Sequence, residues 1–137
     1  MNLLALITDN VTEMLVRVME FTQIRQKILT HNIQDMHKAG FVPRDLAVQQ
    51  FSEAMNTAIE EHLQHNRLVL CDGDSIKFGS DGRLVAHPVS DHLGEQLLTD
   101  DPDQYLELQI DRLLENSLNQ RIAAELLRQR HQAVMIC

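Results

Sequence analysis

The first 39 residues contain neither glycine nor proline, and apolar side chains recur through them at alternating three- and four-residue steps. This is the spacing of a coiled-coil seam, in which one stripe of a long helix packs against a neighbour. We therefore predict a single helix over residues 1–38. Its packing stripe consists of Leu4, Ile7, Val11, Met14, Val18 and Phe21, and Ile28 continues the stripe, with Arg25 and Asn32 on the same track.

Turn signals then divide the rest of the chain. Gly40 tolerates positive φ and Pro43 cannot continue a helix, so the first helix is expected to end there. Asp45 is a candidate N-cap for a second helix over residues 44–66. Between residues 67 and 89, Asp-Gly pairs separate short β-favouring runs, which predicts a small β-hairpin or a three-stranded meander.

A polar connection over residues 88–102 leads into a third helix, predicted over residues 103–135. The expected fold is mainly α and forms one domain over residues 1–137. In it the long N- and C-terminal helices form a coiled-coil-like pair, accompanied by the middle helix and the β insertion. The terminal helices would be roughly 55 Å and 50 Å long. A compact domain of this size is roughly 35–40 Å across, so both helices are expected to overhang and to need other molecules.

Charge and composition exclude several functions. Residues 44–103 carry four basic and twelve acidic side chains, which accounts for the whole net charge of −8. An acidic middle with neutral ends argues against a nucleic-acid partner, which requires a basic stripe. The apolar start of the chain lacks a basic signal-peptide region and is too short to insert into a membrane. The mixed charges of the first helix favour protein helices over lipid as its partner.

No catalytic or metal-binding pattern stands out. His62 and His65 are three residues apart on a predicted helix, but no zinc motif surrounds them, so we interpret them as exposed histidines. The two cysteines, Cys71 and Cys137, do not make a disulfide framework. We predict no enzymatic activity, no catalytic residues, no metal site and no cofactor.

One motif resembles a known family. Arg25, Gln26, Ile28, Leu29, Asn32 and Ile33 spell R-Q-x-I-L-x-x-N-I, and Gly40, Phe41, Arg44 and Asp45 belong to the segment G-F-x-x-R-D-L that follows six residues later. This order resembles the N-terminal signature of bacterial flagellar basal-body rod proteins, most closely the proximal-rod branch. The family pattern reads R-Q-x-I-L-x-x-N-I-A-N-x-x-T-P-G-[FY]-x-x-R-D-[IL]. Here Asp35 replaces its second asparagine, and Lys38-Ala39 replaces its Thr-Pro.

A second match lies near the C-terminus, where Leu114, Glu115, Asn116 and Leu118 resemble the family's [DE]-N-x-L element. The resemblance implies a structural subunit that assembles with copies of itself and with other rod subunits through its terminal helices. It also implies export by the flagellar type III apparatus without a signal peptide, and a final location in the periplasmic basal body. The competing hypothesis is a soluble helical adaptor or regulator that self-associates through a coiled coil.

Individual motif residues have two interpretations each. Asn32 either ends a helix as an exposed polar residue or bonds through its side chain to the backbone of the turn. Arg25 is either a solvated charge or a contact that sets the register of packing, within or between subunits. Phe41 is expected to anchor the core below the turn, and Gly40 to cap the first helix.

Overall fold

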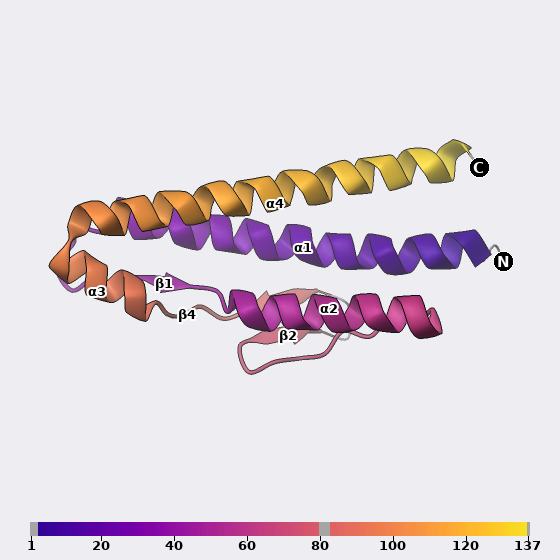
Figure 1. Cartoon of the computed structure of the whole chain (residues 1–137), viewed down its shortest axis with the longest axis horizontal. Helices are drawn as coiled ribbons and strands as arrows, with labels where there is room; N and C mark the ends of the chain where they lie inside the picture. Colours follow the sequence, from indigo (N-terminus) through magenta and orange to yellow (C-terminus); the bar gives the residue numbers. More distant parts are fainter. Residues whose placement is uncertain (1–2, 80–82, 137) are drawn as a thin grey trace.

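The computed structural model describes the backbone of residues 3–79 and 83–136, and the side chains of residues 10–79 and 83–132. Figure 1 shows a mainly helical chain in which two long terminal helices pack together, as the sequence predicts. The helices are α1 (Leu3–Gln34), α2 (Val48–His65), α3 (His92–Asp100) and α4 (Pro102–Ile136). The strands are β1 (Arg44–Asp45), β2 (Ile76–Phe78), β3 (Leu84–Ala86) and β4 (Val89–Ser90).

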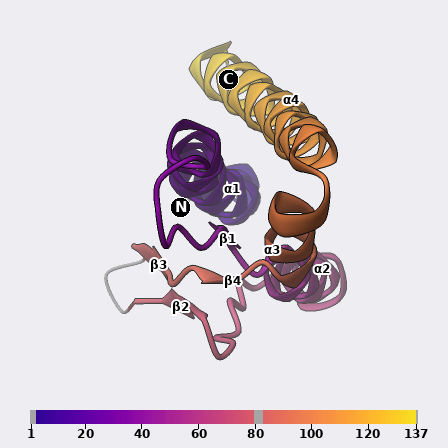
Figure 2. The ribbon, with the colours of Figure 1, turned by 90° about the vertical axis from the view of Figure 1, so that its left-hand side faces the viewer.

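Helices α1 and α4 run antiparallel, and both chain ends lie at the same end of the molecule (Figure 1). Viewed along the helices, α4 lies on one side of α1, while α2 and the β2–β3 hairpin lie on the other (Figure 2). The apolar core occupies this second side. Phe21 of α1 stacks on Phe51 of α2 with ring centroids 4.1 Å apart, and Ile76 and Leu84 of the hairpin are buried in the same cluster.

Helix α1 ends at Gln34, four residues earlier than predicted. Beyond it, three-residue turn bonds replace the helical ladder: the Lys38 amide donates to the Asp35 carbonyl, and the Phe41 amide donates to the Lys38 carbonyl. The Asp35 carboxylate also pairs with His31 and Lys38. The prediction of a helix to residue 38 was therefore wrong, because Asp35 stabilises a turn at that point.

The prediction that Asp45 caps the second helix was also wrong. Helix α2 begins at Val48, its N-cap position is Ala47, and no side chain caps it. Arg44 and Asp45 instead form β1, which pairs antiparallel with β4 at Arg44–Ser90 and Asp45–Val89. This pairing joins segments that are about 45 residues apart in the chain, so no pattern among neighbouring residues predicts it.

In the predicted β insertion, β2 and β3 form the expected antiparallel hairpin. Residues 67–71 do not form a strand, which excludes a three-stranded meander in the described part of the chain. The predicted polar connection contains α3, whose N-cap Asp91 accepts a hydrogen bond from the Gly94 amide at 3.0 Å. The sequence Asp91-His92-Leu93-Gly94 places a capping aspartate three residues before that amide, which is an ordinary helix-start signal.

Candidate functional site

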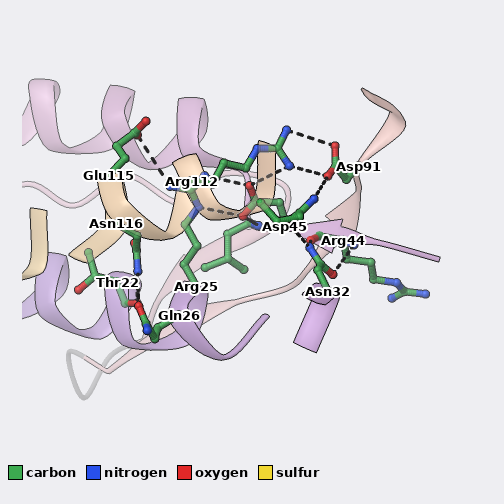
Figure 3. A network of polar contacts seen from close by, with 12 residues as sticks. Thr22, Arg25, Gln26, Asn32, Arg44, Asp45, Asp91, Arg112, Glu115 and Asn116 are labelled. Atoms are coloured by element: carbon green, nitrogen blue, oxygen red, sulfur yellow. Dashed lines mark hydrogen bonds and ion pairs between the residues drawn. The ribbon is translucent and has the colours of Figure 1, made fainter. Parts of the chain in front are cut away.

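Several residues of the family-like motif, among them Arg25, Asn32, Asp45 and Asn116, lie together at the junction of α1, β1, α3 and α4 (Figure 3). Asn32, in the last turn of α1, is 3% exposed. Its side-chain amide nitrogen donates to the Arg44 carbonyl at 2.7 Å, and its side-chain oxygen accepts from the Arg44 amide at 3.2 Å. The predicted bond between Asn32 and the turn backbone is confirmed. These two hydrogen bonds hold the chain as it returns after α1, although Asn32 and Arg44 are twelve residues apart.

Arg25 makes the second connection between α1 and β1. Its guanidinium donates to both oxygens of Asp45, at 2.9 Å from Nε and 3.0 Å from Nη2, and both residues are buried. One Asp45 oxygen also accepts from the Leu46 amide at 2.7 Å. Such bidentate pairs fix orientation as well as distance. Arg25 therefore sets the register of β1 against α1 within one chain, and it is not a solvated charge.

A second, partly buried ion pair connects α3 to α4. Arg112 of α4 donates to both oxygens of Asp91, the N-cap of α3. Burial opposes ionisation of Asp91, but the hydrogen bonds from Arg112 and from the Gly94 amide outweigh it and hold the pKa of this carboxyl below its ordinary value of 3.8. Arg112 also lies 3.9 Å from Asp45, so the two ion pairs are neighbours.

Sequence reasoning missed Tyr105 and Gln109, two α4 residues that are fully buried. The Tyr105 hydroxyl donates to the Asn32 carbonyl at 2.7 Å, and Gln109 accepts from the Asn32 side chain at 3.0 Å. Burial raises the pKa of Tyr105 to about 12, so this hydroxyl is a permanent donor at neutral pH. The buried α4 residues Gln109, Asn116 and Ala123 recur every seven residues, but none of them is a large apolar side chain, so hydrophobic periodicity does not reveal this face.

The C-terminal element meets the N-terminal motif directly. Asn116 is 1% exposed, and its side chain donates to the Thr22 carbonyl at 2.8 Å and reaches the Gln26 side chain at 3.5 Å. Glu115 lies 3.9 Å from the Arg25 guanidinium. Two segments about 90 residues apart in sequence thus form one interface. We call the buried polar groups at this junction the polar network; it consists of Arg25, Asn32, Asp45, Asp91, Tyr105, Gln109, Arg112 and Asn116.

Leu114 and Leu118 do not pack against α1. Their side chains are 65% and 58% exposed. Each lies two positions from Asn116, which is about 200° around an α-helix. Since Asn116 faces α1, both leucines point away from it.

The described side chains of the N-terminal packing stripe lie in or against the apolar core. Met14 and Phe21 are buried in the apolar core, and Val11 and Val18 pack against that core. The side chains of Leu4 and Ile7 lie outside the described residues.

Five further residues of the N-terminal motif lie in the last turns of α1 or in the turn that follows. Leu29 is fully buried, whereas Ile28 and Ile33 are half-buried. Gly40 has the expected positive φ of +75°, but the prediction that it caps the first helix was wrong, because α1 already ends at Gln34. Phe41 is not a core anchor, since it is half-buried, lines a surface hollow with Ile28 and Val42, and meets the His31 ring edge-on.

The arrangement contains no group poised for a reaction. Arg25, Asp45, Asp91 and Arg112 are all engaged in mutual ion pairs. Among the described residues, no group of three or more histidine, cysteine or acidic side chains is placed to hold a metal ion. His62 contacts Asn10 and His65 pairs with Glu61, so the two histidines have separate partners. In the part of the chain that the structure describes, no helix has the length and apolar character needed to cross a membrane.

Comparison with known proteins identifies no relative: no family model, no curated protein and no solved structure matches the chain. The role of the junction therefore follows from its own contacts. The polar network fixes the angle at which β1 leaves α1 and the register of α4 along α1. Its contribution is structural, because each of its side chains binds another part of the same chain.

Proposed function

We propose that this protein is a structural subunit of the bacterial flagellar basal-body rod, of the proximal-rod type, and that it assembles through its terminal helices with copies of itself and with other rod subunits. It acts without catalysis and without a cofactor. The proposal includes export through the flagellar type III apparatus and a final location in the periplasmic basal body.

The observation that carries the proposal is the meeting of the two motif segments. The resemblance rests on residues 25–46 and on residues 114–118, and the predicted pairing of the terminal helices does not by itself specify that these two segments meet. In the folded chain, Asn116 contacts Gln26 and Glu115 approaches Arg25. A motif retained by chance would have no reason to converge in this way, whereas a motif that defines a helix pair and its turn would do so.

The shape of the molecule gives further support. The two terminal helices form a long antiparallel pair that extends beyond the α2 and hairpin layer (Figure 1). Along α4, the apolar side chains of Ile110, Leu114, Leu118, Ile122 and Leu126 are between 42% and 65% exposed. A row of large exposed apolar groups is typical of a surface that another protein covers.

The decisive experiment asks whether the protein is part of the basal body. A strain lacking the gene should be non-motile, and an epitope-tagged chain that restores motility should be found in purified basal bodies by immunoblotting and by immunogold labelling. Normal motility of the deletion strain, with the tagged chain confined to the cytosolic fraction, would contradict the rod assignment and support the adaptor hypothesis.

A further inference from the structure

The face of α4 that points away from α1 carries a regular pattern of its own. Between residues 107 and 128, exposed side chains recur there at alternating four- and three-residue steps. This is the heptad spacing by which one helix follows another. We call this face the outer track; it consists of Glu107, Asp111, Leu114, Leu118, Arg121, Glu125 and Arg128.

The outer track is distinct from the seam that packs on α1. The seam residues Gln109, Asn116 and Ala123 are at most 2% exposed, whereas every residue of the outer track is exposed. In the described part of the chain, the side chains of Glu107, Asp111 and Arg121 take part in no intramolecular hydrogen bond or ion pair. Arg128 is different, because it pairs with Glu125 within the helix.

The charges of the outer track are arranged about its centre. Leu114 and Leu118 lie two residues before and after position 116, while Asp111 and Arg121 lie five residues before and after it. Two such helices that cross antiparallel at position 116 would therefore place Leu114 of one against Leu118 of the other. The same register would place Asp111 of each beside Arg121 of the other, so the track is complementary to itself about a two-fold axis.

We infer that the outer track binds a second copy of this chain in this antiparallel register. A parallel in-register pair would set Asp111 beside Asp111 and Arg121 beside Arg121, and like charges placed side by side repel each other. The antiparallel pair covers all four leucines and gives Asp111 and Arg121 of each copy an opposite partner. Glu107 would then approach Glu125 of the second copy, where Arg128 already neutralises Glu125.

This inference does not rest on the flagellar assignment. An isologous contact closes after two copies, unlike the open contacts that build a rod. The inferred dimer concerns chains outside an assembled rod, where each copy covers Leu114 and Leu118 of the other. The dimer and the basal-body location are therefore tested by separate measurements, and either result can fail without the other.

Sedimentation equilibrium of the full chain tests the contact. Wild type should show a reversible monomer–dimer equilibrium. Asp111→Arg and Arg121→Asp should each raise the dimer Kd by at least about tenfold, since each places like charges together twice. An equimolar mixture of these two variants should recover dimer at the wild-type level, because in the mixed dimer one ion pair keeps its native sign and the other reforms with reversed sign. Glu60→Arg, an equal charge change on exposed α2, is the matched control and should leave the Kd unchanged.

The register has its own test. In chains carrying Cys71→Ser and Cys137→Ser, a mixture of Asp111→Cys and Arg121→Cys chains should form a disulfide-linked heterodimer under mild oxidation. Circular dichroism of each variant verifies that it is folded. A wild-type chain that stays monomeric up to millimolar concentration would overturn the inference. So would dimers that ignore both charge reversals, failure of the mixture to recover dimer, or preferential cross-linking of Asp111→Cys to itself.

Discussion

Arg25 of α1 and Asp45 of β1 lie twenty residues apart in sequence, and the Arg25 guanidinium binds both oxygens of the Asp45 carboxylate inside the protein. Between them the chain ends a helix, turns at Gly40 and starts back along α1. Water reaches little of either partner, since Arg25 is 5% exposed and Asp45 is 9% exposed. The pair therefore acts as a fixed point from which the position of β1, and through it β4, is set.

Removal of one partner of this pair should be far more harmful than removal of both. Arg25→Met or Asp45→Leu alone leaves a buried charge without compensation, and we expect each to lower the free energy of unfolding by about 3–5 kcal/mol. The double variant should recover a large part of that loss, because two apolar side chains need no charge partner. Urea unfolding followed by circular dichroism measures all three. Arg128→Ala, which breaks an exposed pair, is the control and should change little.

Asn32→Ala should loosen the turn without removing apolar packing. The substitution leaves the Arg44 amide and carbonyl and the Gln109 side chain without their partner, and we expect a loss of about 2–3 kcal/mol in unfolding free energy. Hydrogen exchange should show faster exchange at the Arg44 amide. Gln34→Ala, on the exposed side of the same turn of α1, is the control. Unchanged protection of Arg44 in Asn32→Ala would contradict the role given to this side chain.

At Gly40 the backbone conformation alone should determine the effect of substitution. A Cβ built there has no atom within 4 Å, so nothing clashes with it, but φ is +75°. Gly40→Val should therefore cost at least about 1–2 kcal/mol of stability, and Gly40→Asn should cost less, because asparagine tolerates this region better. Thermal unfolding of the two variants beside wild type measures the difference. Equal stability of all three would show that the turn adopts another conformation in solution.

Acid should weaken the attachment of α3 to α4. The pKa of Asp91 is lower in the folded protein than its ordinary value of 3.8, so the ionised form stabilises the fold. That contribution is fully present above the unfolded-state pKa and is lost as the pH falls from about 4 through the folded-state pKa. Asp91→Asn should be less stable than wild type at pH 7, and its unfolding free energy should fall less steeply below pH 4. Urea unfolding at a series of pH values compares the slopes, and parallel slopes would exclude Asp91 as a source of acid sensitivity.

Local patterns in the sequence determined the three longer helices, the left-handed glycine and the hairpin, whereas α3 was not predicted. The uninterrupted apolar spacing before Gly40 predicts α1, and the Asp-Gly pairs predict the turn between β2 and β3, because periodicity and turn chemistry act over a few residues. The same local signals placed Asn32 at the end of a helix, where its side chain meets the backbone of the turn. They did not identify its other partners, Tyr105 and Gln109, which lie more than 70 residues away.

Only the tertiary structure decided which face of α4 is buried. Leucine is the commonest residue of this helix, but its leucines lie on more than one face, so their presence does not identify the face that packs on α1. The fold instead buries Gln109 and Asn116, because α1 presents Asn32, Gln26 and the Thr22 carbonyl along that seam, and buried polar groups require partners. The leucines are left on the outside. Apolar character indicates that a side chain will be covered, but the surface that covers it depends on where the polar groups of distant segments find one another.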